Sequence, residues 1–246
     1  MSKLIHAGAL TAAVFAATAC AQSSESSMDR EAIEEIVHAY IVENPEVIEE
    51  ALINLQAQAE ARETEAQRAA IAQNMDDIYK DDSDYGVGPE DAPVTIVEFV
   101  AYDCIFCQRS LDWTMGLPEK YDGKVRVVFK DYARGSEWSE QAALAALAAG
   151  EQGKYLEMHK ELFADSERTM EAILAAAERA GVDAAQMQAD MESVKIRKAL
   201  ADTMSLSRRI NVNATPTFLI GETVVAGARA DMVDSAIQSE LAELEG

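Results

Sequence analysis

The sequence predicts an α/β fold in which a small sheet is interrupted by an all-helical insertion and preceded by a long helical arm. A β-branched and aromatic run at residues 94–100 has the composition of a central strand, and it leads directly into a Cys-x-x-Cys motif at residues 104–107. A second strand-like run follows at residues 124–131. A strand, a helix and a strand so close in the chain form a βαβ unit with parallel strands. Two further short strands are expected only much later, within residues 217–226.

The composition limits the classes of function. The chain has 246 residues, ample apolar content for a packed core and a net charge of −23, so nucleic acids and anionic membrane surfaces are poor partners. Of its three cysteines, Cys20 belongs to a processing signal. The remaining pair is too few for the disulfide framework of a small secreted domain.

Residues 1–21 predict a targeting segment, which we favour over an N-terminal core helix and exclude from the fold. A lysine precedes an apolar run that is too short to span a membrane, and residues 17–20 then read Ala-Thr-Ala-Cys. These four residues fit an A-x-A cleavage site, and they also resemble an imperfect bacterial lipobox with Cys20 as the lipid-bearing residue. The sequence thus predicts export to the bacterial periplasm, where disulfides persist, either as a lipoprotein or as a freely soluble protein.

Residues 22–85 predict a helical arm and a linker. After a Ser-rich tether, an acidic, amphipathic helical stretch runs from Asp29 to Lys80 and is interrupted by Asn44-Pro45. We expect Asn44 to cap the second helix and Pro45 to take its first position. Residues 81–93 are rich in acidic residues, glycine and proline, and they predict the linker to a catalytic domain at residues 86–246.

The arm carries an apolar stripe that must be buried against a partner surface. Its members recur at helical spacing and are Ile33, Val37, Tyr40, Val47, Ala51, Leu55, Ala59, Ile71, Met75 and Ile78. The arm either folds back on its own catalytic domain or packs against further copies of the chain. We favour a homo-oligomer through residues 29–80, although the stripe is too irregular to define the number of copies.

The remainder of the catalytic domain is expected to be helical before the chain returns to the sheet. Residues 136–210 contain no strand pattern and predict several short helices. A hairpin with Gly221-Glu222 at its turn then joins strands at 217–220 and 223–226, and an amphipathic helix closes the chain. This order of elements is that of a thioredoxin-type fold with an all-helical insertion.

The Cys-x-x-Cys motif predicts redox chemistry. At a helix N-terminus, the free N–H groups and the helix dipole stabilise a thiolate on the first cysteine, and the spacing lets the second close a disulfide. A structural zinc site needs four ligands, whereas His38 and His159 are isolated residues that we expect on helix surfaces. A purely structural disulfide across two residues would constrain little of the unfolded chain.

Together with the segment Asn213-Ala214-Thr215-Pro216-Thr217-Phe218, this motif resembles the DsbA-like branch of the thioredoxin superfamily over residues 94–246. The resemblance implies that Cys104 is the exposed nucleophile and Cys107 the buried resolving cysteine. It also implies that Pro216 is cis, faces the two cysteines and offers backbone to an extended client segment.

The same resemblance assigns further residues around the motif. Glu98 matches a buried acid that relays a proton to or from Cys107; the alternative is a strand glutamate facing water, but the apolar run around it favours burial. Thr215, before the cis-proline, resembles isomerases more than oxidases. Ile105-Phe106 departs from the Pro-Tyr or Pro-His of relatives and lacks a histidine, so we expect Cys104 to be less acidic than in the strongest oxidants.

The stretch EEIVHAYIVENPEVIEEAL in the arm resembles suppressor-of-copper-sensitivity C-type and outer-membrane thioredoxin-like proteins, in which such an arm oligomerises the catalytic domains. We therefore expect a thiol–disulfide oxidoreductase that acts on cysteines of exported proteins as an isomerase or reductase. It would need a membrane redox partner, and neither a cofactor nor a metal. A DsbA-like oxidase, a Cu(I)-sequestering protein and a structural lipoprotein are the alternatives.

Overall fold

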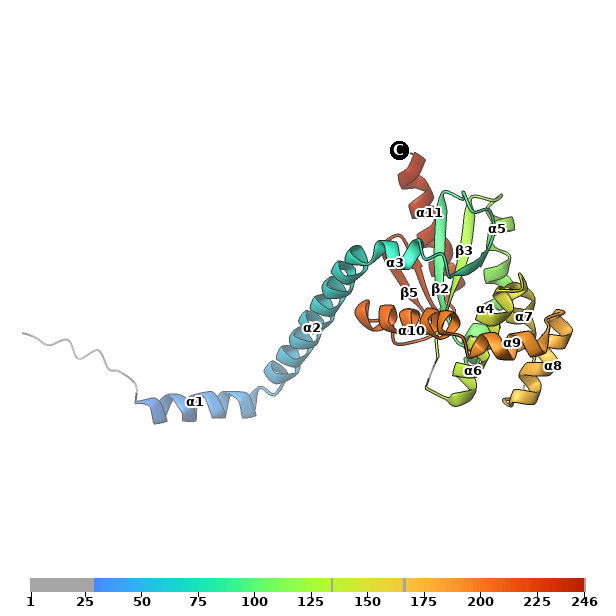
Figure 1. The fold of residues 1–246 in the computed structure, drawn as a ribbon. Helices are drawn as coiled ribbons and strands as arrows, with labels where there is room; N and C mark the ends of the chain where they lie inside the picture. The colour runs from blue at the N-terminus through green and yellow to red at the C-terminus, as the bar shows by residue number, and fades with distance from the viewer. Residues whose placement is uncertain (1–28, 134, 166, 246) are drawn as a thin grey trace, which may run out of the picture. The chain divides into compact units, whose positions relative to one another are not determined.

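The computed structural model describes residues 29–133, 135–165 and 167–245, and its helices and strands carry the labels of Figure 1. The chain divides into two compact units, Met1–Ala57 and Gln58–Gly246. The targeting segment expected at residues 1–21, with Cys20, lies outside the described residues. None of the helices that the structure describes combines the length and apolarity that a membrane crossing requires.

The first unit holds α1 (Arg30–Glu43) and the beginning of α2 (Glu46–Gln73). α1 contains no buried residue, and its side chains Ile33, Ile36, Val37, Tyr40 and Val42 are exposed. The Asn44 side chain donates a 2.8 Å hydrogen bond to the carbonyl oxygen of Tyr40. Asn44 therefore satisfies the last turn of α1, and the prediction that it caps the second helix is wrong.

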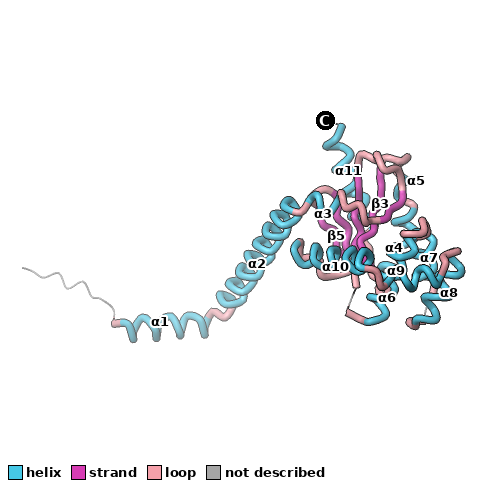
Figure 2. Tube along the Cα trace, in the orientation of Figure 1, coloured by secondary structure: helices cyan, strands magenta, loops and turns pink. Residues whose placement is uncertain are grey.

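The second unit is built on a five-stranded sheet in the order β1-β3-β2-β4-β5, drawn in magenta in Figure 2. Its strands are β1 (Tyr85–Val87), β2 (Val94–Val100), β3 (Val125–Asp131), β4 (Thr217–Ile220) and β5 (Thr223–Ala226). β2 pairs in parallel with β3, and the other neighbouring pairs are antiparallel. The predicted βαβ unit and hairpin are confirmed. β1 lies in the segment predicted as a linker, because three residues are too few to give a strand pattern.

Helices occupy two of the intervals between consecutive strands. α4 (Ile105–Met115) and α5 (Leu117–Lys120) connect β2 to β3. Between β3 and β4 the predicted all-helical insertion is confirmed, and it consists of α6 (Glu137–Gly150), α7 (Tyr155–Ala164), α8 (Met170–Ala180), α9 (Ala184–Met191) and α10 (Val194–Arg209). α11 (Ala230–Glu245) follows the hairpin.

Both faces of β2 are buried. Ile96 and Val100 belong to one apolar core together with side chains of α6 and α7, whereas Val97 and Phe99 belong to a second core. This alternation follows from the two-residue repeat of a strand. β2 is therefore fixed from both sides before it delivers the chain to the Cys-x-x-Cys motif.

The second core includes residues that we expected on the arm. Ile71 of α2 and Ile78 of α3 (Met75–Tyr79) are fully buried against Val97 and Phe99. The Tyr79 hydroxyl also donates a 2.7 Å hydrogen bond to the Gly221 carbonyl oxygen. The prediction that residues 29–80 lie outside the catalytic core is therefore wrong for this stretch, because the outer face of the sheet needs an apolar cover.

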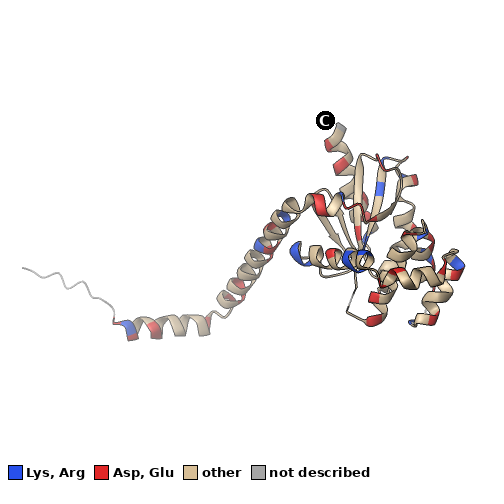
Figure 3. Ribbon diagram, viewed as in Figure 1, with Lys and Arg blue, Asp and Glu red and all other residues tan. Residues whose placement is uncertain are grey.

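Acidic residues are distributed over helices of both units (Figure 3). Two acidic residues of the expected linker, Asp81 and Asp84, pair with Lys130 of β3. Lys130 Nζ lies 2.5 Å from Asp84 Oδ2 and 3.6 Å from Asp81 Oδ2, and the lysine side chain is fully buried. Removing the carboxylates would leave a buried cation without compensation. This ion pair attaches the segment before β1 to the sheet.

An aromatic stack joins β1 to the insertion. The rings of Tyr85 and Tyr155 lie 4.6 Å apart at an interplanar angle of 14°. Gly150, the last residue of α6, permits this packing, because a Cβ atom there would lie 2.1 Å from Tyr85 Cζ. The absence of a side chain at Gly150 is thus required by the position of the Tyr85 ring.

Gly150→Ala should destabilise the fold by about 1–3 kcal/mol, because the added methyl group displaces the Tyr85 ring from its stack. Denaturant unfolding measures this loss. In a Tyr85→Ala background the same change should be neutral or stabilising, since alanine favours a helix over glycine by about 0.5–1 kcal/mol. Equal losses in both backgrounds would contradict the role given to the Tyr85 ring.

Candidate active site

The two cysteines lie where β2 ends and α4 begins. Cys104 is the N-cap residue of α4, and its sulfur accepts a hydrogen bond from the Cys107 N–H at 3.4 Å. The Cys104 N–H donates to the Ala101 carbonyl oxygen at 3.1 Å and so closes the turn before the helix. Both thiols are free. The expected strand-to-helix delivery of the motif is therefore present.

The loop before β4 faces the first cysteine. The Thr215–Pro216 peptide bond is cis, as expected, and the Cys104 sulfur lies 3.1 Å from the Thr215 carbonyl oxygen, to which it donates when it is protonated. This loop covers much of the sulfur, so Cys104 is only 7% exposed, compared with 1% for Cys107. Cys104 is thus the more accessible of the two but less open than the resemblance implies.

The two thiols have opposite acidities. A hydrogen bond from the Cys107 thiol lowers the pKa of Cys104 to about 5 against the opposing effect of burial, with help from Thr215 and from the N–H groups of Cys107 and Phe106. Burial raises the pKa of Cys107 far above its ordinary value, and the Cys104 contact and the charge of Glu98 act in the same direction. At neutral pH, Cys104 is therefore a thiolate and Cys107 a thiol.

Glu98 lies beneath this pair in β2 and is 2% exposed. Burial raises the pKa of Glu98 to about 8 although Ser110 opposes it. Ser110 Oγ lies 3.2 Å from Glu98 Oε1 and 2.9 Å from the Cys107 carbonyl oxygen. A hydroxyl has one proton to donate. Both contacts are satisfied when the Ser110 hydroxyl donates to the Cys107 carbonyl oxygen and a protonated Glu98 donates to Ser110.

The sequence did not single out Ser110, although a signal for it was present. Ser110 follows Cys107 by three residues on α4, so the two share one face of the helix. That face is buried, since Cys107, Ser110 and Thr114 are buried on α4. A polar residue three positions after a resolving cysteine therefore indicates a contact with the buried acid, here between Ser110 and Glu98.

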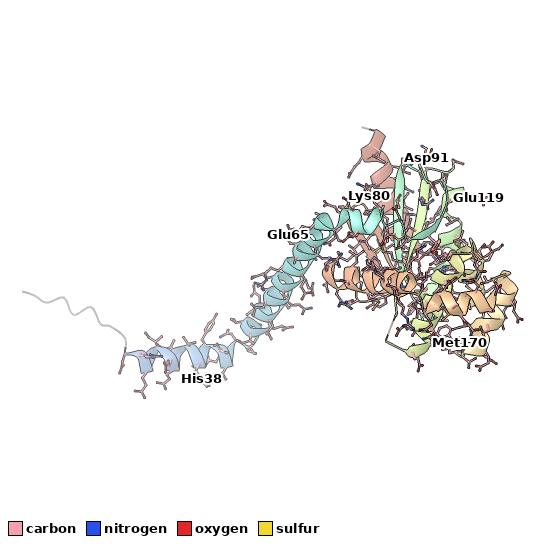
Figure 4. The ribbon with its side chains drawn as sticks, viewed as in Figure 1. His38, Glu65, Lys80, Asp91, Glu119 and Met170 are labelled. Carbon is pink, nitrogen blue, oxygen red and sulfur yellow. The ribbon has the colours of Figure 1, made fainter. Side chains whose placement is uncertain are left out.

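His159 lies inside the second unit, so the prediction that it lies on a helix surface is wrong. It is 1% exposed, and its Nδ1 lies 2.9 Å from the Tyr102 hydroxyl. Its ring centroid lies 4.5 Å from that of Phe129. Burial lowers the pKa of His159 to about 3 and keeps the ring neutral. His38, by contrast, is exposed on α1 (Figure 4), as predicted.

A second buried acid lies near this histidine. Asp131, at the end of β3, is 2% exposed and accepts a 3.1 Å hydrogen bond from the Tyr155 hydroxyl. Burial raises the pKa of Asp131 to about 7, although contacts with Tyr102 and Tyr155 oppose the rise. Asp131 and Tyr155 thereby connect β3 to α7, and Tyr102 and His159 connect the active-site turn to the same helix.

Metal ligation has little support in this site. Within residues 29–133, 135–165 and 167–245, no group of three or more His, Cys, Asp or Glu side chains is arranged to hold a metal ion. Two thiols of very different acidity are suited to sulfur exchange, in which one sulfur attacks and the other follows.

Stability should fall as pH rises because of the buried acids Glu98 and Asp131, and Asp84, whose pKa burial raises to about 7, contributes in the same direction. A carboxyl group with a raised folded-state pKa holds its proton more tightly in the folded state, so folding loses free energy between the ordinary pKa of Glu98, 4.5, and its folded value of about 8. Asp131 acts in the same direction between 3.8 and about 7. Denaturant unfolding from pH 5 to pH 8 should show a decline on the order of 1 kcal/mol per pH unit.

Glu98→Gln should flatten this decline, because glutamine does not titrate. Glu222→Gln, at the exposed hairpin turn, is the matched control and should leave the slope unchanged. A wild-type stability that rises over this pH range, or a slope unaffected by Glu98→Gln, would show that Glu98 is not a buried acid with a raised pKa.

Solved structures of thioredoxin-like proteins are similar to this chain. A thioredoxin-like oxidoreductase from Silicibacter pomeroyi is 32% identical with a TM-score of 0.64, and the match covers 67% of this chain and 95% of that one. Proteus mirabilis ScsC in a transitional conformation is 27% identical with a TM-score of 0.62, and the match covers 87% of this chain and 97% of that one.

Curated relatives share only part of their length with this chain. Na(+)/H(+) antiporter NhaA 3 of Salinispora tropica is 30% identical over 142 residues, which is 56% of this chain and 22% of the antiporter. The chain thus spans about a fifth of the length of the curated relatives that it matches.

Two family models match separate parts of the sequence. The model described as the copper resistance protein ScsC N-terminal domain matches residues 29–62, and the model described as thioredoxin matches residues 80–239. The second match spans more than half of the chain and includes both cysteines, Glu98 and the cis-proline. The chain therefore belongs to the thioredoxin family.

Proposed function

We propose that the protein is a thiol–disulfide oxidoreductase that acts on cysteines of exported proteins, as an isomerase or reductase. The observation that carries the proposal is the difference between the two thiols. The pKa of Cys104 is lowered to about 5 beside the Thr215–Pro216 loop, whereas burial raises the pKa of Cys107. A site with one ready nucleophile and one suppressed thiol is suited to forming mixed disulfides with clients.

The reaction begins with attack by the Cys104 thiolate on a sulfur of a client disulfide. A bond forms between Cys104 and that sulfur, and the other client sulfur leaves as a thiolate. In isomerisation, a different client thiolate then attacks the client sulfur of the mixed disulfide and releases Cys104. No net electrons are transferred, and Cys104 is a good leaving group because its pKa is low.

In reduction, Cys107 completes the cycle. Its thiol loses a proton, its sulfur attacks Cys104, and the client leaves reduced while a Cys104–Cys107 disulfide forms. Two electrons have then passed to the client, and a membrane redox partner must return them. Glu98 is the proposed proton acceptor in its ionised state, because a group with a pKa of about 8 gains and loses its proton near the working pH of a general base.

The suppressed acidity of Cys107 favours isomerisation over rapid oxidation or reduction. Since only the thiolate attacks, burial of Cys107 slows resolution and lengthens the life of the mixed disulfide. A client held longer on Cys104 has more time for a second client thiol to attack. Slow resolution by Cys107 therefore supports an isomerase in preference to the DsbA-like oxidase.

The exposed arm supports a homo-oligomer, which would bring several active sites to one client. The large apolar side chains exposed on α1 and the beginning of α2 are Ile33, Ile36, Val37, Tyr40, Val42, Val47, Ile48, Leu52, Ile53 and Leu55. A helix with so much apolar surface requires a partner surface. We propose that this partner is the same segment of further copies, and that residues 58–80 belong with the catalytic unit instead.

The remaining proposals concern location and copper. The targeting segment supports export to the bacterial periplasm, and Cys20 is the residue that a lipid anchor would use. Two thiolates can hold Cu(I), but the raised pKa of Cys107 opposes the second thiolate. Copper sequestration is therefore not favoured, and neither is a structural lipoprotein with incidental redox activity.

Cys107→Ser should trap clients, because resolution is lost while attack by Cys104 remains. Expression in a bacterial periplasm, followed by acid quenching and non-reducing gels, should reveal mixed disulfides that disappear on reduction. Cys104→Ser is the matched control and should trap none. A copper-sequestering protein would give no client adducts with either variant, and that result would sink the proposed exchange reaction.

Reactivation of scrambled ribonuclease should require the arm. We expect the mature protein to reactivate the substrate, and a chain that begins at Gln58 to lose most of this activity at equal active-site concentration. A truncation at Gly86 is unsuitable, because it removes the buried Ile71 and Ile78. If both proteins oxidise reduced ribonuclease and neither unscrambles it, the isomerase proposal is wrong and the DsbA-like oxidase is supported.

Substitutions in the full chain separate oligomerisation from truncation damage. Ile48→Ser with Leu52→Ser removes exposed apolar surface from the arm, so it should lower both the oligomeric state in light scattering and the isomerase activity. Val194→Ser alters the 84% exposed Val194 of α10 and should change neither. Full isomerase activity in a monomeric arm variant would contradict the role of the arm.

A further inference from the structure

The residues that flank the two cysteines are held by the helical insertion. The Tyr102 hydroxyl contacts His159 of α7 at 2.9 Å, and Gln108 Nε2 donates to the carbonyl oxygen of Phe163 at 2.5 Å. Between them lies Asp103, the residue before the nucleophile. The Asp103 carboxylate faces the start of α6. Of the three residues Tyr102, Asp103 and Gln108, only Asp103 is charged.

Asp103 takes one hydrogen bond on each carboxylate oxygen. Ser136 Oγ donates to Oδ2 at 3.2 Å, and Ser139 Oγ donates to Oδ1 at 3.3 Å. Ser136 is also the N-cap of α6, because its oxygen accepts the Ser139 N–H at 3.1 Å. The carboxylate therefore lies at the positive end of a 14-residue helix, which favours a negative charge there.

Arg168 adds a third attachment. Its Nη2 donates to the Asp103 carbonyl oxygen at 3.4 Å, and its guanidinium lies 4.9 Å from the ring centroid of Trp138. Glu137 and Glu140 also lie in the first turn of α6. The carboxylate is thus held by two hydroxyl donors at the end of α6, and the backbone of Asp103 is held by one cation, all from the insertion.

The Cys104 sulfur has a different set of partners. It contacts the Cys107 N–H and the Thr215 carbonyl oxygen, neither of which belongs to the insertion. From within the core, Glu98 and Cys107 face the same sulfur. Asp103 is its nearest acidic neighbour in the chain, and a carboxylate released from α6 could rotate toward it.

We propose that Ser136 and Ser139 are positioning residues that hold the carboxylate of Asp103 against α6, so that its negative charge does not oppose the thiolate of Cys104. The helical insertion thereby controls how much of the nucleophile is ionised. The inference rests on the proposed use of Cys104 as nucleophile, and it holds equally for an isomerase, a reductase or an oxidase.

The physical reason is repulsion between like charges. A carboxylate within several ångströms of a thiolate disfavours ionisation of the thiol and raises its pKa. Releasing the Asp103 carboxylate should raise the measured pKa of Cys104 by about 0.5–1, an effect typical of a partly solvated charge pair. The thiolate fraction near pH 5 should then fall about two- to fivefold.

The test measures the acidity of Cys104 directly in the full chain. The reduced protein is alkylated with iodoacetamide across pH 3–9, and peptide fragmentation assigns the adduct to Cys104, so that Cys20 and Cys107 do not contribute. Ser136→Ala with Ser139→Ala should shift the rate profile to higher pH. Asp103→Asn should not, and in the Asp103→Asn background the two serine substitutions should have no further effect.

Thr169→Ala is the matched control, because Thr169 caps α8 of the same insertion through the Ala172 N–H at 3.1 Å. It should weaken a helix start without moving the Cys104 profile. If the serine double variant fails to fold, Ser136→Ala alone, at an exposed position, should give a smaller shift in the same direction.

Three results would overturn the proposal: an unchanged Cys104 profile in the serine variants, an equal shift in the Asp103→Asn background, or an equal shift with Thr169→Ala. The readout is alkylation of one sulfur and needs no client. A failure here therefore leaves the client-trapping and ribonuclease experiments untouched, and failure of those experiments leaves this result interpretable.

Discussion

The hydrogen bond that the Cys104 sulfur accepts from Cys107 is the interaction on which the site depends. It requires Cys104 to cap α4, so that the N–H of Cys107 points back at the sulfur. The helix start is fixed in turn because β2 is buried on both faces and is central in the sheet. Two apolar cores thus serve to place one sulfur atom, and the acidity of Cys104 is a consequence of the fold as a whole.

Two buried carboxyl groups lower stability near neutral pH, and they do so in different places. Glu98 lies under α4 and contacts Ser110, which also contacts the Cys107 backbone. Asp131 lies at the end of β3 and accepts from Tyr155 of α7. An apolar residue at either position would remove the cost of burying an acid. The proposed proton transfer therefore explains why an acid is buried at Glu98. The hydrogen bond that attaches the insertion explains why one is buried at Asp131.

The features that could be predicted from the sequence are those determined by neighbouring residues. The composition of residues 94–100 was enough for a central strand, whereas the loop opposite the cysteines was expected from the family resemblance that the segment around Pro216 carries. What was missed depends on contacts between distant segments. His159 is buried because Tyr102 and Phe129 surround it, and Ile78 is buried because Val97 and Phe99 need a cover. An isolated histidine or an isoleucine in an acidic helix carries no local sign of such partners.

The insertion contributes more to this site than coverage of the sheet. Tyr102, Asp103 and Gln108 surround the cysteines in the sequence, and each has a polar partner between Ser136 and Arg168. Without these helices, the three side chains would meet water, which holds neither a carboxylate nor a hydroxyl in one orientation. The hydrogen bonds to the insertion do orient them, and the Tyr102–His159 contact is buried, so breaking it leaves an unsatisfied group. Movement of α6 or α7 would therefore change the surroundings of Cys104 before it changed the sheet, so a client that binds the insertion could alter the reactivity of the nucleophile without touching the cysteines.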